Sequence, residues 1–141
     1  MKSKIKIKKL NDEGKINMPI YKGDKLDIMF KLQKHLQSKL GIYNKIKTKA
    51  DKQSYINQMI LALHEEAVEI MRETSYKNPK YVKFGWKIGQ KGNNENFKNE
   101  IVDILHFVLN LVIISGMNTD ELFNRYIGKN KENERRKNNG Y

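Results

Sequence analysis

Three stretches of the chain place apolar residues every three or four positions, which is the spacing of one face of an α-helix. They cover about residues 24–40, 53–74 and 96–115. A fourth helix is expected from Asn118, because Glu121 stands three residues later as in a capping box. The third stretch is apolar on nearly every face, so we expect it to be the central buried helix. The pattern predicts an all-α bundle of about four to five helices.

Two segments lack a helical period. In residues 1–22, Ile5 and Ile7 alternate with lysines, which predicts either a short strand in a β-hairpin or a flexible arm. Residues 75–95 interleave aromatic residues with lysines. This second composition suits a lid that stacks on a base and neutralises phosphates, and equally an aromatic patch that folds back on the core.

Acidic residues form two pairs on the second and third predicted helices: Glu66 with Glu69, and Glu100 with Asp103. Residues three apart share one helix face, and like charges there destabilise a helix by about 0.2–0.5 kcal/mol per pair. Glu66 lies on the apolar stripe, where an acid is seldom buried unless it is paired or binds a metal. Carboxylates are the ligands that Mg²⁺ prefers. The two pairs therefore predict a magnesium site, bordered by Glu65.

Polar residues also interrupt the apolar stripes. Gln33 and Gln37 lie within the stripe of the first helix. Each either bonds a neighbouring helix, sits at the rim of the buried face, or presents its donor and acceptor to a base. Asn110 stands among apolar residues two turns along from Asp103 and needs a partner. His106 is either a metal ligand or, as is commoner, bonded to a neighbouring carbonyl group.

The chain carries 28 basic and 16 acidic residues, a net charge of +12. This balance favours an anionic partner, although a composition bias toward lysine and asparagine would also produce it. The absence of cysteine excludes disulfides, thiol chemistry and cysteine-ligated zinc. Residues 1–20 lack the apolar run of a signal peptide, and the longest apolar stretch, 104–114, is too short to span a bilayer. We expect a soluble, cytoplasmic protein.

The pattern Glu65-Glu66-x-x-Glu69 followed by Glu100-x-x-Asp103 resembles the signature of the all-α NTP pyrophosphatases, the MazG-like superfamily. Residues 96–107, together with Leu32-Gln33, are similar more specifically to the dimeric all-α dUTPases of bacteria and phages. The tail also fits the spacings of that family, at Lys129, Asn130, Lys131, Asn133, Arg136 and Gly140-Tyr141. The chain departs from the family in a long stretch between the acidic pairs, in a lysine where glutamine is common, and in its N-terminal extension.

The resemblance implies hydrolysis of dUTP to dUMP and pyrophosphate, with water attacking the α-phosphorus. It implies two or more Mg²⁺ ions per site, held by Glu66, Glu69, Glu100 and Asp103. Glu66 or Glu69 would also position the attacking water, and Glu65 would be an outer ligand or support the others. The residues expected to bind substrate are Gln33, Trp86, Asn110, Lys129, Asn130, Lys131, Asn133 and Arg136. In this scheme Gln33 hydrogen-bonds the uracil edge, Trp86 stacks on the base and Asn110 supports the sugar or the base. The residues of the tail bind the phosphates.

The implied organisation is a basic extension over residues 1–24, a pyrophosphatase domain over 25–134 and a phosphate-binding tail over 135–141, assembled as a homodimer. One rival is a MazG-like enzyme acting on dCTP or another non-canonical nucleotide, since its acids would be identical. A remoter rival is a non-enzymatic helical protein that binds nucleic acid through its lysines, with the tail as a frayed terminus. That rival leaves the inward-facing acids unexplained, so nucleic acid and membrane are disfavoured as partners.

Overall fold

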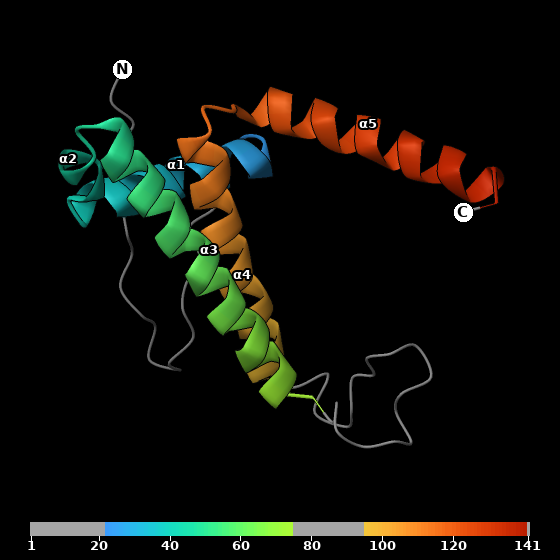
Figure 1. Cartoon of the computed structure of the whole chain (residues 1–141), viewed down its shortest axis with the longest axis horizontal. Helices are drawn as coiled ribbons and strands as arrows, with labels where there is room; N and C mark the ends of the chain where they lie inside the picture. The colour runs from blue at the N-terminus through green and yellow to red at the C-terminus, as the bar shows by residue number, and fades with distance from the viewer. Residues whose placement is uncertain (1–21, 75–94, 141) are drawn as a thin grey trace.

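The computed structural model describes residues 22–74 and 95–140. Within these ranges the chain forms five α-helices and no strand (Figure 1). In chain order they are α1 (Lys25–Lys39), α2 (Ile42–Lys45), α3 (Lys49–Arg72), α4 (Glu95–Ile114) and α5 (Thr119–Asn138). The predicted all-α class and number of helices are confirmed. The N-terminal hairpin or arm and the aromatic, lysine-rich stretch lie almost wholly outside the described residues.

The start of α3 differs from the prediction by about one turn. A helix was expected from about Gln53, but α3 begins at Lys49 behind a capping box. The Thr48 hydroxyl accepts a hydrogen bond from the Asp51 N–H at 3.1 Å, and the Asp51 carboxylate accepts one from the Thr48 N–H at 2.8 Å. These bonds satisfy N–H groups that the first turn of a helix leaves unpaired. Aspartate in the place of the more usual glutamate conceals this signal in the sequence.

Helices α3 and α4 lie side by side and run in opposite directions, and α1 crosses α4 near its C-terminal end (Figure 1). The hydrophobic core lies at this crossing, where Phe30 of α1 packs with Leu109 and Val112 of α4. Partly buried apolar side chains surround these three: Leu26, Met29, Ile113, Met117 and Leu122. The core thus fixes the end of α4 against α1, and the far halves of α3 and α4 extend beyond it as a two-helix hairpin.

The expectation that α4 is the central buried helix is met only in part by the described residues of the single chain. Helix α4 does contact both α3 and α1. However, four of its apolar side chains remain between 38% and 49% exposed: Ile101, Val102, Leu105 and Val108. The described residues supply too few helices to cover every face of a helix this apolar, so one side of α4 stays open.

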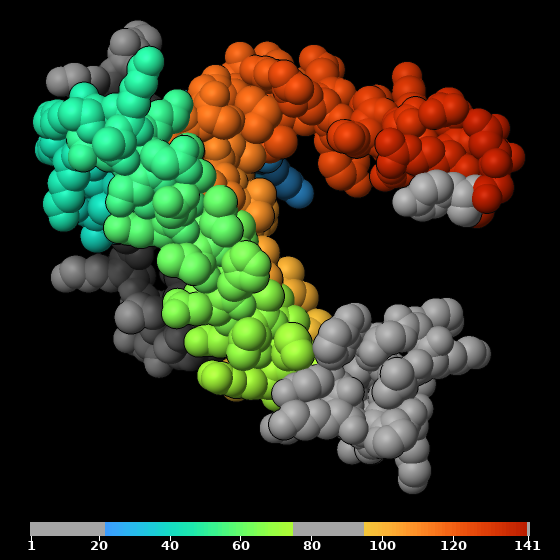
Figure 2. All heavy atoms as spheres, viewed as in Figure 1, coloured from blue at the N-terminus to red at the C-terminus, as the bar shows by residue number. Residues whose placement is uncertain are grey.

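Helix α5 leaves the body of the molecule as an arm. Gly116 ends α4 in the left-handed conformation, with a φ of 89°, and the axes of α4 and α5 are bent by 109° at this break. Near its start α5 packs Leu122 on the core, and Thr119 donates a hydrogen bond to Asp27 of α1. Open space separates its C-terminal half from α3 and α4 (Figure 2). No single helix in the described ranges is long and apolar enough to cross a membrane; the bent pair α4–α5 meets that test only jointly, by length and composition.

Candidate metal and nucleotide site

The two acidic pairs meet across the α3–α4 hairpin. One carboxylate oxygen from each of Glu66, Glu100 and Asp103 lies within 4.8 Å of the other two. Glu69, one turn after Glu66 on α3, shares a hydrogen bond with the Glu100 carboxyl group. One cation can reach all three oxygens with small side-chain movements, since oxygen ligands lie about 2.1 Å from Mg²⁺. The donor set, carboxylate oxygens only, matches a hard divalent cation.

The carboxylates of the cluster raise one another's pKa values. The pKa of Glu66 is raised by partial burial and then by the negative charges of Glu69 and Asp103. The pKa of Glu100 is also raised, by partial burial, by the charges of Glu69 and Asp103 and by the shared hydrogen bond. Within residues 22–74 and 95–140, the ion pairs of the structure lie elsewhere, on α5 and at the start of α4. Without a cation, these carboxylates repel one another.

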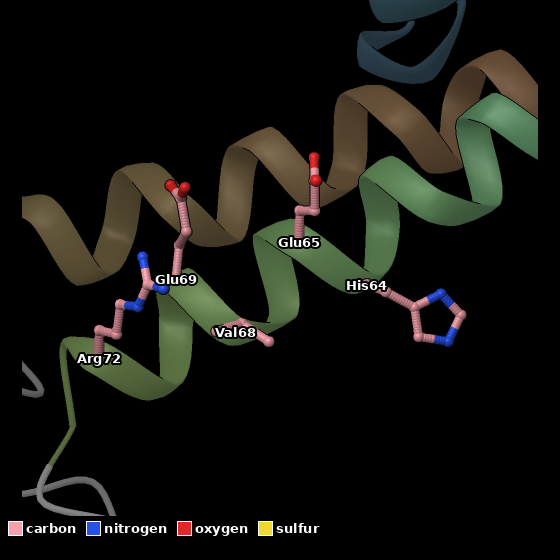
Figure 3. Close-up of a pocket in the computed structure, with 5 residues that line it drawn as sticks. All are labelled: His64, Glu65, Val68, Glu69 and Arg72. Atoms are coloured by element: carbon pink, nitrogen blue, oxygen red, sulfur yellow. The ribbon is translucent and has the colours of Figure 1, made fainter.

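The solvent side of the cluster is a pocket along α3 of about 460 Å³. Figure 3 shows Glu65 and Glu69 on the side of α3 along which α4 runs, with Arg72 one turn beyond, whereas His64 points away. The ring of His64 is instead held by the Ile60 carbonyl oxygen, 2.8 Å from its Nδ1 atom. Glu65 therefore borders the acidic cluster from its exposed edge, and the pocket gives solvent and anionic ligands access to it.

A chain of hydrogen-bonded side chains, buried at Gln33 and Asn110, links α1, α4 and α3. Gln33 is 2% exposed and its Nε2 donates to Asn110 Oδ1 at 2.7 Å. His106 Nδ1 lies 2.7 Å from Gln33 Oε1, and Asn110 Nδ2 donates to the Met59 sulfur at 3.4 Å. These contacts bring two of the expected base-binding residues together. His106 does not belong to the carboxylate cluster, and its ring bonds an amide oxygen instead. Gln37 takes the helix-bonding alternative, because its Oε1 accepts a hydrogen bond from Tyr55 at 3.2 Å.

Gln33 and His106 are also the polar members of an apolar pocket of about 490 Å³ between α1 and α4. The other lining residues are Met29, Leu32, Leu36, Val102, Leu105 and Leu109. An apolar cavity with a few converging polar groups is the usual form of a small-molecule site. Along the axis of α4 its polar corner lies about 5–10 Å from Asp103, because each residue advances the helix by about 1.5 Å.

The basic tail residues lie elsewhere in the single chain. Lys129, Asn130, Lys131, Asn133 and Arg136 are all exposed on the C-terminal half of α5. That half stands well apart from α3 and α4 (Figure 1). Within the tail, Arg135 and Arg136 both bond Glu132, which lowers the pKa of that carboxyl group to about 2. The structure therefore does not bring the tail next to the acids of its own chain, and Trp86 lies outside the described residues.

Sequence reasoning did not identify His106, Met59 or Tyr55 as partners in these polar contacts. Their spacing along the chain carries no signal, because each contact joins residues on different helices. The sequence gives one clue, a side-chain amide on an apolar stripe. A buried amide needs a hydrogen-bond partner, but the sequence does not indicate which residue that partner is.

An all-α fold with convergent carboxylates on two antiparallel helices offers the oxygen ligands that a hard divalent cation prefers. A family model described as dUTPase matches residues 25–119, which is more than half of the chain. The chain belongs to this dUTPase family. A segment of 44 residues is also 54% identical to the dCTP pyrophosphatase of Enterobacteria phage T4. That segment covers 31% of this chain and 26% of the relative, so the match spans about a quarter of the relative's length. No solved structure matches the chain.

Proposed function

We propose that the protein is a magnesium-dependent dUTP diphosphatase, which hydrolyses dUTP to dUMP and pyrophosphate. The observation that carries this proposal is the convergence of Glu66, Glu100 and Asp103 within 4.8 Å across two helices. The raised pKa values of Glu66 and Glu100 support it, because an arrangement of mutually repelling acids is favourable only when cations occupy it. Membership of the dUTPase family supports the reaction.

In this proposal Glu66, Glu69, Glu100 and Asp103 hold two or more Mg²⁺ ions, with Glu65 at the outer edge. Bound Mg²⁺ supplies Lewis acidity and neutralises the charge of the triphosphate. Glu66 or Glu69 orients the attacking water and accepts its proton as the oxygen bonds to the α-phosphorus. The bond from the α-phosphorus to the bridging oxygen then breaks, and pyrophosphate leaves. Both glutamates lie on α3, and Glu69 lines the pocket that would admit water.

The apolar pocket between α1 and α4 suits the base. Its volume falls within the range of small-molecule sites, and its polar corner offers the amide of Gln33 to a base edge. Its distance of about 5–10 Å along α4 from Asp103 is comparable with the reach from the α-phosphate of a nucleotide to its base. Asn110 acts in this scheme by holding Gln33, and Trp86 is proposed to stack on the base.

The segment shared with the phage dCTP pyrophosphatase favours a second candidate, hydrolysis of dCTP by the same acids. The two functions differ only at the base, because the phosphates and the sugar are identical. A panel of dUTP, dCTP, dTTP and UTP with Mg²⁺ distinguishes them. A higher kcat/KM for dCTP than for dUTP would replace the first candidate with the second.

The acids themselves are tested by Glu66→Gln and Asp103→Asn. Each change removes a charge but keeps the size of the side chain, so we expect helix content to be unchanged and Mg²⁺-dependent hydrolysis to fall by more than about 100-fold. Glu95→Gln is the matched control, because it removes an exposed acid from α4 outside the cluster. Near-normal turnover by either cluster variant would exclude the proposed ligands.

We also propose that the protein acts as a homodimer with a site at the subunit boundary. The apolar face of α5 supports this, since Phe123 and Tyr126 are 57% and 69% exposed and Ile127 continues the same face. Helix α5 carries the proposed phosphate-binding groups away from the acids of its own chain. Its apolar face is not covered by any described residue, and a second subunit would cover it.

A further inference from the structure

The hydrogen bonds from Met59 to His106 form one directed chain. A thioether sulfur only accepts hydrogen bonds, so Asn110 must present its NH₂ group to Met59, at 3.4 Å. The Asn110 oxygen therefore faces Gln33, whose Nε2 donates to it at 2.7 Å. The Gln33 oxygen is thereby turned toward His106. It can accept there only if His106 Nδ1 carries a proton, and these two atoms are 2.7 Å apart. The Met59 sulfur thus reveals the direction of the series, and the Gln33 amide is held at both of its ends, by the Asn110 oxygen and by the His106 Nδ1–H.

This direction matters because the Gln33 amide lines the apolar pocket. An amide has two N–H donors and two lone pairs on its oxygen, so one bond from each end leaves one donor and one acceptor for a ligand. Position 4 of a pyrimidine is an acceptor oxygen in uracil and a donor NH₂ group in cytosine. Position 3 is reversed, with a donor in uracil and an acceptor in cytosine. Turning the amide over would therefore exchange the base that it matches.

We propose that His106 is a positioning residue for base selection: its Nδ1–H holds the oxygen end of the Gln33 amide while Asn110 holds the nitrogen end, and the orientation that they fix together discriminates between uracil and cytosine. This inference rests on the proposed function, because it concerns the base of the same substrate. His106 lines the pocket next to Gln33, at its polar corner. It binds neither metal nor phosphate, and it acts on the base only through the amide.

The kinetic test compares kcat/KM for dUTP and dCTP in His106→Leu and His106→Asn. Leucine fills the space without a donor, whereas asparagine keeps an N–H near the position of Nδ1. We expect His106→Leu to reduce the preference between the two substrates by roughly tenfold, the effect of one lost hydrogen bond. We expect His106→Asn to retain most of that preference. His35→Leu is the matched control, since His35 is exposed on the same helix as Gln33.

A merely structural role gives a different result. If His106→Leu lowers kcat/KM for both nucleotides by the same factor, the chain only joins three helices and the proposal is wrong. If His106→Leu does not fold, His106→Met replaces it, because its thioether fills similar space and has no donor for Gln33; an unchanged preference there would equally overturn the proposal. A wild-type protein that hydrolyses neither nucleotide would refute the proposed function, and the base-selection role with it.

A second measurement does not depend on activity. Nitrogen-15 NMR of the histidine rings at a pH where they are neutral identifies the protonated nitrogen of each. We expect His106 to be protonated on Nδ1 in the wild type, and to lose this preference in Gln33→Leu. Protonation on Nε2 in the wild type would mean that Nδ1 accepts from Gln33, which reverses the amide and overturns the proposal.

Discussion

At the acidic cluster, the metal-free protein holds together carboxylates that would be further apart in the unfolded chain. The raised pKa values of Glu66 and Glu100 have a definite consequence for stability. A carboxyl group whose pKa is raised on folding binds its proton more tightly in the folded state. Lowering the pH from neutral through the raised pKa therefore stabilises the metal-free fold, and raising the pH removes that stabilisation. Because Mg²⁺ competes with these protons, its stabilising effect should weaken over the same pH range.

Glu66→Gln should accordingly raise the melting temperature of the metal-free protein at pH 7, because it relieves repulsion from Glu69 and Asp103. The same change should reduce the rise in melting temperature that Mg²⁺ produces, since a ligand stabilises the fold only in proportion to its binding. Thermal melting with EDTA and with Mg²⁺ measures both effects, and Glu95→Gln should alter neither. Equal melting temperatures of wild type and Glu66→Gln in EDTA would show that the cluster is not under electrostatic strain.

At the residue scale the sequence predicted the proximity of the acids, but not the polar chain beside them. Helical periodicity places Glu66 and Asp103 on the apolar faces of their helices. When two such helices pack through their apolar faces, the acids on those faces come close together. The bonds of Gln33 join residues 77 and 73 positions apart, and they depend on how α1 crosses α4. Local periodicity contains no information on a crossing, so the partner of the buried amide could not be assigned.

At the scale of elements, the apolar stripes predicted three of the five described helices and the capping box a fourth, whereas α2, which has only four residues, was missed. The tail was the least determined element, because a run of charges fits both a frayed end and a binding helix. In the structure α5 continues to Asn138, and Glu132 supports its last turns by bonding Arg135 and Arg136 at 2.8 and 3.0 Å. Such exposed pairs at i,i+3 and i,i+4 support a helix only weakly, because solvent screens them.

Removal of residues 129–141 should raise KM for dUTP by about tenfold or more, since each lost charged hydrogen bond to phosphate contributes about 1.5–3 kcal/mol. It should leave the melting temperature nearly unchanged, because the core lies at the crossing of α1 and α4 and includes nothing beyond Leu122. Arg136→Gln isolates one phosphate contact, with Arg125→Gln as its control, because Arg125 pairs with Glu121 on the same helix outside the tail. An unchanged KM in the truncated protein would make the tail a solvated terminus.

At the scale of the whole molecule, the acids and the basic tail cannot act on one triphosphate within the chain as it is folded here. Helix α5 departs from α4 at 109°, and its charged half points away from the α3–α4 hairpin (Figure 1). If the tail does bind phosphates, either α5 swings back about Gly116, or it serves the acids of a second copy. The exposed Phe123 and Tyr126 favour the second arrangement. A second subunit would cover this apolar face, whereas a movement of α5 about Gly116 does not by itself account for it.

Mixing two variants that are both impaired at low dUTP decides between these arrangements. One variant, Glu66→Gln, has a defective acidic cluster and an intact tail, and the other, lacking residues 129–141, has the reverse. In a mixed dimer with tails exchanged between subunits, the intact acids of one chain meet the intact tail of the other, so one wild-type site is restored. We expect activity at low dUTP to rise on mixing toward about a quarter of wild type, since random pairing makes half of the dimers mixed and each carries one good site. Sedimentation of each variant as a dimer is the control. Dimers that exchange subunits yet gain no activity would mean that the tail serves its own chain, and a monomer at active concentrations would remove the second copy from the mechanism altogether.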